Sequence, residues 1–429
     1  MNKIFNSIPL PTRAPDGEYD CGRGSYMLLW SDSSPDEFER LCGDITASGF
    51  KLFDRTDIEG NIHCTFAGKP VLHAWYCPCE RALRLTADPY TSLYNTAPER
   101  CERKYGNTLW QFEVDHSLID CGMCYIVRCC DGSFFVIDSA HMYSVNDDIR
   151  IIEFLRKLNG GAKPTVAGWF FSHGHEDHVA KFSDILEFRS DEADIETVYY
   201  NFPSYGHPDN EEWGECGKQV MHRFERELDK HPEIKKVRLH TGQRFFVRDL
   251  EFSVLCTHED IYPNPLSNFN DSSTAIMMTA GGCKVLFPGD CAAESDKVFL
   301  RRYHDALKCS VVQVSHHGHS GTSSEFYRRA GAECVLFPIT EIKFAEEWDK
   351  QEPNRVAVDI AKEYHIASNG TVEIPLPYSF GGTKRLPDET FEDFEGIFAL
   401  WCYEYTDEYK EKLLSLIHIS EPTRPLYIS

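Results

Sequence analysis

Apolar residues in the first hundred positions form short runs interrupted by one helical period. An apolar run at 26–30 predicts a strand. Ser34 and Pro35 suit the cap and first turn of a helix, in which apolar residues recur at spacings of three and four until Gly49. These apolar residues are Phe38, Leu41 and Ile45. Strand-like runs at 62–66 and 71–75 follow, so a small α/β N-terminal domain of unknown role is predicted over residues 1–105.

A second alternation of strands and helices begins near position 106. Its predicted elements are strands at 123–129 and 133–137, a helix from Asp147 to Leu158, and strands at 166–171, 252–255, 284–288, 311–314 and 371–375. Asp131-Gly132 between the first two strands is typical of a hairpin turn. This alternation predicts a layered α/β domain over residues 106–377, in which the strand at 371–375 is the last.

Two segments follow this domain. Residues 378–413 are predicted to be a C-terminal extension with a helix at 405–413. From Leu414 the chain reads LSLIHISEPTRPLYIS, and residues 414–424 resemble a sequencing-library adapter translated in frame. An ordinary tail is the alternative. We predict that residues 414–429 are a non-native tail, which carries no information on the fold.

Charge narrows the classes of partner. The chain has 44 Lys and Arg against 68 Asp and Glu, a net charge of −24. Non-specific binding to nucleic acids depends on Lys and Arg that neutralise phosphates, so strong binding of this kind is not expected. An anionic membrane surface is disfavoured for the same reason. A small-molecule or nucleotide-type substrate remains compatible, because a bound metal supplies its own positive charge. The oligomeric state is not predicted.

The apolar runs are too short for a membrane span, which needs about 18 residues. Residues 1–20 lack the apolar core of a signal peptide, so a cytoplasmic protein is expected. The 17 cysteines are an odd number at irregular spacings and are expected to be reduced thiols. Three close pairs, Cys121/Cys124, Cys77/Cys79 and Cys129/Cys130, are interpreted as core residues, with a structural zinc or redox pair as the alternative.

A dense group of metal-type ligands follows the strand at 166–171. Residues 172–178 read SHGHEDH, with three imidazoles and two carboxylates in six positions. Imidazole and carboxylate suit Zn²⁺, Mn²⁺ or Fe, and Gly174 allows a tight bend that turns several donors toward one point. A solvated polar turn is the alternative. It is weakened because two later strands also end in such residues, the strand at 284–288 in Asp290 and the strand at 311–314 in His316 and His317.

Strand ends of this kind lie along one edge of an α/β sheet, where ligand sites form. The ordered set resembles the metallo-β-lactamase superfamily: an aspartate at a strand end (Asp138), the HxHxDH motif at 173–178, Gly289-Asp290, and a late histidine. The resemblance covers about residues 107–377. Within the superfamily the chain is most similar to the hydrolase domains of bacterial competence-type DNA-uptake proteins and of choline-phosphate esterases, because of Asn270-Asp-Ser-Ser273 and His316-His-Gly318.

The resemblance implies an αββα sandwich, here preceded by the small α/β domain. It implies a hydrolase in which two divalent ions, most simply Zn²⁺ with Mn²⁺ or Fe possible, hold a bridging hydroxide. The implied ligands are His173 and His175 on the first metal, Asp177 and His178 on the second, Asp290 on both, and a late histidine. His317 is favoured over His316 as the late ligand. Asp177, which would also orient the hydroxide, and His317 are the expected catalytic residues.

Other roles are left open by the resemblance. Asp138 is either a hydrogen-bonding support for the motif loop or a plain strand-end aspartate. His258 is a positional candidate for a third histidine on the first metal, although competence-type relatives often lack this ligand. His316 or His319 is the expected proton donor to the leaving group.

Phosphoester or phosphodiester hydrolysis is the expected reaction. Two alternatives stand beside it: hydrolysis of a lactone, thioester or amide, and a non-catalytic metal-binding sensor or interaction protein.

Overall fold

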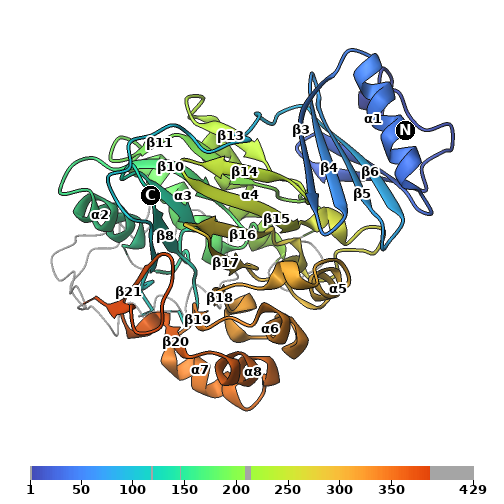
Figure 1. Cartoon of the computed structure of the whole chain (residues 1–429). Coiled ribbons are helices and arrows are strands. Elements are labelled where there is room, and N and C mark those ends of the chain that lie inside the picture. The colour runs from blue at the N-terminus through green and yellow to red at the C-terminus, as the bar shows by residue number, and fades with distance from the viewer. Residues whose placement is uncertain (1, 117–118, 145, 208–213, 387–429) are drawn as a thin grey trace.

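The computed structural model describes residues 2–116, 119–144, 146–207 and 214–386. Within them the chain forms an N-terminal unit with one sheet and a larger unit with two (Figure 1). The helix predicted at 405–413 and the tail at 414–429 lie outside the described residues. No helix in the described part of the chain combines the length and apolar character needed to cross a bilayer.

The N-terminal unit is a six-stranded antiparallel sheet in the order β1-β2-β6-β5-β4-β3 with one helix on its face. Its elements are β1 (Gly17–Gly22), β2 (Ser25–Trp30), α1 (Pro35–Ala47), β3 (Lys51–Ile58), β4 (Asn61–Ala67), β5 (Val71–Cys77) and β6 (Ala82–Asp88). The Ser34 hydroxyl accepts a hydrogen bond from the Glu37 amide and so caps α1, as its sequence predicts. The apolar stripe of α1 packs on the sheet through Phe38, Leu41 and Ile45.

The larger unit contains two mixed sheets. The nine-stranded sheet has the order β13-β12-β10-β9-β8-β7-β21-β22, with β11 beside β10. Its strands are β7 (Thr108–Gln111), β8 (Tyr125–Arg128), β9 (Phe134–Ile137), β10 (Thr165–Phe170), β11 (Asp194–Ile195), β12 (Thr197–Tyr200), β13 (Lys235–Arg238), β21 (Val372–Pro375) and β22 (Lys384–Arg385). The seven-stranded sheet runs in sequence order through β14 (Arg244–Val247), β15 (Leu250–Cys256), β16 (Ala275–Ala280), β17 (Cys283–Phe287), β18 (Val311–Gln313), β19 (Cys334–Phe337) and β20 (Glu363–Ile366).

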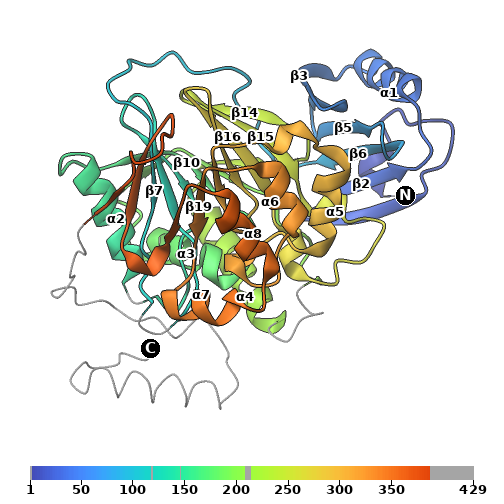
Figure 2. The ribbon, with the colours of Figure 1, turned by 60° about the horizontal axis from the view of Figure 1, so that its bottom comes forward.

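The inner faces of the two sheets share one apolar core, which includes Phe135, Phe252 and Phe287. Helices α2 (Asp147–Leu158), α3 (Glu176–Phe188) and α4 (Gly214–Asp229) cover the nine-stranded sheet through a second core. Helices α5 (Ala293–Arg302), α6 (Ser324–Ala330), α7 (Glu341–Trp348) and α8 (Glu352–Ile360) lie on the seven-stranded sheet (Figure 2). The predicted αββα sandwich, preceded by a small α/β unit, is confirmed.

The individual elements follow their predictions with one exception. The β8–β9 hairpin, helix α2 and the strands β10, β15, β17 and β18 lie where the hydrophobic pattern puts them. The expectation that 371–375 is the last strand is wrong, because β22 follows it and pairs with β21. Two residues are too few to show a period of two, so the pattern could not reveal β22.

A buried polar interface joins the N-terminal unit to the sandwich. Asp260, after β15, pairs with Arg84 of β6 and with Arg302 of α5, and none of these three side chains is more than 5% exposed. The two guanidinium groups lie over the ring of Trp75, at 4.1 and 4.6 Å from its centroid. These contacts hold the N-terminal sheet beside the ends of β14 and β15 (Figure 1).

Candidate metal centre

The HxHxDH motif lies in the loop that joins β10 to α3. His173 and His175 belong to the loop, whereas Asp177 and His178 belong to the first turn of α3. At Gly174 a Cβ atom would come within 2.5 Å of the Met221 side chain in α4, so the loop can pass there only with glycine. The bend brings side chains from a loop and a helix turn to one point.

Asp290 approaches from the seven-stranded sheet, in the loop between β17 and α5. Gly289 has a φ of +60°, and a Cβ there would lie 2.8 Å from the Cβ of Ser172. This glycine therefore allows the two strand ends to meet. The Ser273 hydroxyl accepts a hydrogen bond from the Asp290 amide at 3.1 Å, and the Asp271 carboxylate accepts one from the Ala292 amide at 3.0 Å. The segment 270–273 thus fixes the Asp290 loop.

The two late histidines lie in a tight turn after β18 and face different partners. Both have positive φ, 49° for His316 and 54° for His317. The Nε2 of His317 lies 2.9 Å from Asp177 Oδ2 and 3.4 Å from Asp290 Oδ2. The Nε2 of His316 instead lies 3.1 Å from the side-chain nitrogen of Asn270. The structure therefore brings His317, and not His316, to the other predicted ligands.

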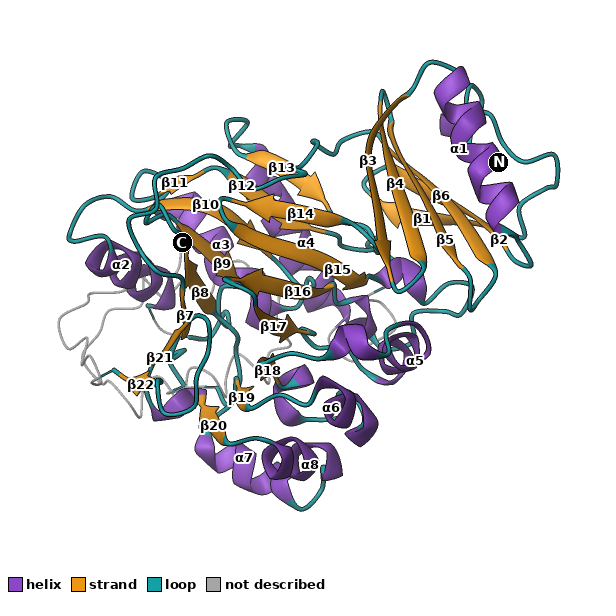
Figure 3. Ribbon diagram, in the orientation of Figure 1, coloured by secondary structure: helices purple, strands orange, loops and turns teal. Residues whose placement is uncertain are grey.

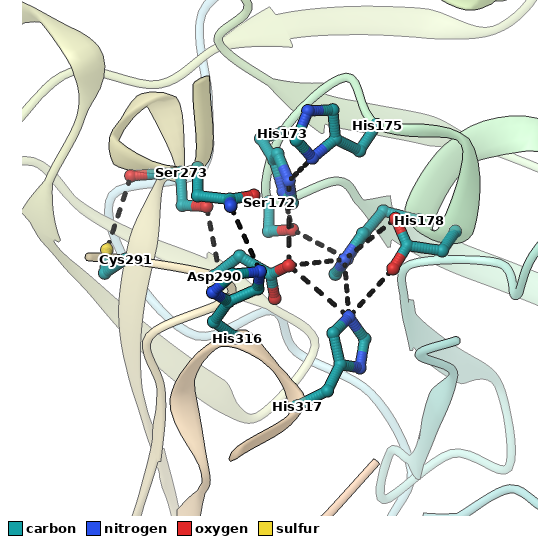
Figure 4. Close-up of polar contacts among 12 residues, drawn as sticks. Ser172, His173, His175, His178, Ser273, Asp290, Cys291, His316 and His317 are labelled. Carbon is teal, nitrogen blue, oxygen red and sulfur yellow. Dashed lines mark hydrogen bonds and ion pairs between the residues drawn. The ribbon is translucent and has the colours of Figure 1, made fainter. Parts of the chain in front are cut away.

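All six predicted ligands meet in two groups that share Asp290 (Figure 4). One group contains His173, His175 and Asp290, and the other contains Asp177, His178, Asp290 and His317. Within each group the ligand atoms lie within 4.8 Å of one another, and every residue except the half-buried His175 is buried. The Asp290 carboxylate lies between the two groups, with Oδ2 at 3.9 Å from His173 Nε2 and 3.2 Å from His178 Nε2.

Hydrogen bonds behind the rings determine which ring nitrogen faces the cluster. The Nδ1 of His178 lies 2.7 Å from Asp138 Oδ2, and the Nδ1 of His317 lies 2.8 Å from the carbonyl oxygen of Pro338. Both oxygens are acceptors, so each Nδ1 donates its proton outward and each Nε2 faces the cluster, where its lone pair can bind a cation. These two Nε2 atoms lie only 3.3 Å apart. Together with the carboxylates of Asp177 and Asp290 they form a set of ligand atoms that a divalent cation would hold in place of protons.

The same convergence explains the charge state of His317. Burial alone would lower the pKa of His317, but the Asp290 and Asp177 carboxylates outweigh burial and raise it to about 10. The Oδ1 of Asp290 is also buried without a hydrogen-bond partner among the described residues. The raised pKa of His317 and the unpartnered Oδ1 of Asp290 both indicate that this cluster of carboxylates is stabilised by a positive charge. The imidazole and carboxylate donors fit Zn²⁺, Mn²⁺ or Fe.

Asp138 supports the motif loop. Besides His178 it accepts hydrogen bonds from the Ser172 amide and hydroxyl, both at 2.8 Å. Its own φ is +55°. Of the two alternatives left by the sequence, the hydrogen-bonding support is the one that the structure shows.

His258 lies apart from both ligand groups. It is buried, and its Nε2 is 3.1 Å from Asn201 Oδ1. Burial lowers the pKa of His258 to about 3, so the ring is neutral at physiological pH. The first group therefore has three protein ligands among the described residues, and a third histidine from this position is not one of them.

A cavity of about 310 Å³ opens onto the ligands. Four of the six ligands line it, His175, Asp177, Asp290 and His317, together with side chains for which no part in this site is predicted from the sequence. These are Ile119, Cys121, His141, Met142, Tyr143, Cys216 and Asn270. They come from loops far apart in the sequence, and no periodicity could assign them to one wall.

The cysteines of the three close pairs lie in different environments in the structure. Cys124 packs in the core, as expected, but Cys121 lies on the cavity wall with its Sγ 3.7 Å from Asp177 Oδ2. Cys77 and Cys79 have sulfurs 3.3 Å apart, and Cys130 is 3.1 Å from Cys101 rather than paired with Cys129. None of these cysteines belongs to a group of metal-type ligands within the described chain. The core interpretation is right for the buried Cys77, Cys124, Cys129 and Cys130, and wrong for Cys121 and the exposed Cys79.

No family model matches the chain, and none of the curated proteins compared with it matches either. Among solved structures, the metallo-β-lactamase fold protein YhfI from Bacillus subtilis is 12% identical, with 61% of this chain and 96% of that one covered and a TM-score of 0.40. Unliganded yeast PDE1 is 10% identical, with 61% and 97% covered and a TM-score of 0.38. A putative metal-dependent hydrolase from Parabacteroides distasonis is 11% identical, with 74% and 99% covered and a TM-score of 0.32. At these values the likenesses carry no functional argument.

Proposed function

We propose that this protein is a metal-dependent hydrolase of the metallo-β-lactamase superfamily that cleaves phosphoester or phosphodiester bonds. The observation that carries the proposal is the convergence of the His178 and His317 ring nitrogens with the carboxylates of Asp177 and Asp290. His173, His175 and Asp290 would hold one divalent cation, and Asp177, His178, Asp290 and His317 a second. When bound, such a pair supplies a water nucleophile at neutral pH and stabilises charge that develops on the substrate.

The protein's own residues have three tasks in this proposal. Asp177 faces both the ligand groups and the cavity, where its carboxylate can orient the attacking water. Asp138, Pro338 and Ser172 hold the imidazoles in the tautomer that binds a cation. A third group must protonate the leaving group.

Two cavity histidines suit that third task. His316 is engaged with Asn270, which leaves His319 of the two residues expected from the sequence. The structure adds His141, whose Nδ1 accepts a hydrogen bond from the Tyr143 amide at 2.9 Å. The ring proton of neutral His141 is therefore on Nε2, where it can be donated. Single replacements of His141 and His319 separate the two candidates.

The cavity favours a small substrate. No described residue on its wall is Lys or Arg, so phosphate charge can be neutralised only by the bound cations. A polymer of phosphates needs a row of basic side chains, whereas a molecule with a single phosphoryl group does not. A volume of about 310 Å³ lies within the size range of small-molecule pockets. The preference for phosphoesters comes from the likeness of 270–273 and 316–318 to competence-type domains.

The test is a substrate panel with the Zn²⁺-loaded full chain and an Asp290→Asn variant. The panel contains chromogenic phosphomonoesters, phosphodiesters, a lactone, a thioester and an amide. We expect turnover of a phosphorus ester that falls at least a hundredfold in the variant, because the shared ligand is lost. Turnover of the carbon esters alone would favour the lactone, thioester or amide alternative. Metal binding without turnover of any class would favour the sensor alternative.

A further inference from the structure

A second group of metal-type side chains lies at the opposite end of the seven-stranded sheet. Cys334 begins β19, and Glu363 and His365 are in the edge strand β20. One ligand atom from each lies within 4.8 Å of the others. Strands β17 to β20 are parallel, and Asp290 and His317 follow their carboxyl ends. The Cys334 group lies at the amino ends and shares no residue with the candidate metal centre.

The strand register places the three side chains on one face. Cys334 is paired directly with Glu363, and His365 is two residues further along β20. Cys334 belongs to the core between the two sheets, so this face is the inner one. The nine-stranded sheet meets it here: Glu363 accepts hydrogen bonds from Tyr378 at 2.9 Å and Thr383 at 3.0 Å. Figure 3 shows β20 at the edge of its sheet near β21 and β22.

The group is incompletely satisfied without a cation. The Nε2 of His365 is buried and has no hydrogen-bond partner among the described residues, although Glu363 Oε2 is 3.8 Å away. A buried polar atom without a partner is unfavourable, because the loss of its hydration is not compensated. A cation bound between the three groups would satisfy His365 and favour the thiolate.

We propose that Cys334, Glu363 and His365 bind a divalent cation of the zinc class that fastens the edge strand β20 to the β21–β22 segment. Thiolate, imidazole and carboxylate are the three ligand types of protein zinc sites. Zinc–ligand bonds of about 2.0–2.3 Å require the ligand atoms to lie closer together than 4.8 Å. Small rotations of the three side chains would bring their ligand atoms to that separation. Binding transfers the Cys334 proton to solvent, and water fills the fourth position.

Cobalt substitution tests this site separately from the candidate metal centre. The six ligands of that centre contain no sulfur, so a near-ultraviolet thiolate-to-cobalt charge-transfer band of the Co²⁺-loaded full chain can come only from a cysteine-ligated ion. We expect the band in the wild type and in Cys121→Ser, and its loss in Cys334→Ser. Absence of the band in the wild type, its persistence in Cys334→Ser, or its loss in Cys121→Ser would overturn the proposal.

A second variant tests the site in case Cys334→Ser misfolds, since Cys334 is fully buried. His365→Gln changes an edge residue, and we expect it to lower the zinc content after dialysis by one equivalent per chain while hydrolytic turnover persists. Replacement of the exposed His304 by Gln is the matched control and should leave the metal content unchanged. An unchanged zinc content in His365→Gln contradicts the site.

Discussion

The Nδ1 atom of His178 lies 2.7 Å from Oδ2 of Asp138, and both side chains are fully buried. Asp138 follows β9 of the nine-stranded sheet, and His178, 40 residues later, lies in the first turn of α3. Because Nδ1 of His178 donates a hydrogen bond to Asp138, the other ring nitrogen, Nε2, faces Asp290. Asp138, which is not itself a predicted metal ligand, therefore determines which ring nitrogen of His178 can bind a cation.

Replacement of Asp138 by Asn tests that relationship. The amide keeps the size of the carboxylate but removes its charge and its preference for a proton on Nδ1. We expect zinc affinity to fall about 10- to 100-fold with the fold retained. Competition with a coloured chelator measures the affinity. Asp305→Asn, at an exposed aspartate, is the control, and equal affinities in the two variants would contradict the role of Asp138.

His258 and His317 are predicted to differ in their effect on metal content. His258 bonds to Asn201 and belongs to neither ligand group, whereas His317 belongs to the second. We expect His258→Asn to keep the full zinc content of the Asp290 cluster, and His317→Ala to lose one equivalent after dialysis. Elemental analysis of the folded proteins gives both values. Loss of zinc from His258→Asn would show that this residue moves into the first group.

Asp260 is predicted to stabilise the interface with the N-terminal unit. Its replacement by Asn leaves Arg84 and Arg302 buried without a charged partner at that position. The loss of one member of a buried ion network costs about 3–5 kcal/mol in the free energy of unfolding. Urea unfolding measures this cost. Asp32→Asn is the matched control, because the Asp32–Arg81 pair is exposed and should contribute at most about 1 kcal/mol; equal costs would refute the prediction.

His240 is predicted to make stability depend on pH. Its Nδ1 lies 2.8 Å from Glu259 Oε1, its Nε2 3.5 Å from Asp88 Oδ2, and its ring stacks on His73. Burial would lower the pKa of His240, but Glu259 and Asp88 raise it to about 9. A raised folded pKa means that the stabilisation is complete below the unfolded value of about 6.5 and is lost as pH rises to about 9.

The measurement compares the free energy of unfolding of the wild type with that of His240→Gln at both ends of this range. The difference should shrink by about 3 kcal/mol between pH 6 and pH 9.5, which corresponds to a shift of about 2.5 pKa units. His304→Gln should show no such change. A difference that stays constant with pH would mean that His240 is neutral in the folded protein.

The sequence predicts those elements that have a regular apolar period and those site residues that directly follow an apolar strand. Helix α2 has a regular apolar period and a clear stop, so its bounds could be stated in advance. Asp290 and His317 could be paired with the motif at 173–178 because each follows an apolar strand, and such strand ends share an edge. The choice of His317 over His316 came from resemblance alone. It depends on two residues with positive φ, a backbone state that apolar periodicity does not encode.

The remaining features depend on tertiary contacts. Cys121 and Cys124 share one motif, but a loop carries Cys121 to the cavity wall while Cys124 enters the core. The polar interface around Asp260 and His240 combines residues about 180 positions apart, and buried charges there contradict the usual preference for apolar cores. Only a folded chain reveals such partners.

The most direct test of the central claim is anomalous diffraction at the zinc edge from crystals of the zinc-loaded protein. At the Asp290 cluster the account predicts two peaks about 3.5–4 Å apart, one beside His173 and His175 and the other beside Asp177, His178 and His317. A single peak in this cluster, or zinc bound without contact to Asp290, would contradict it.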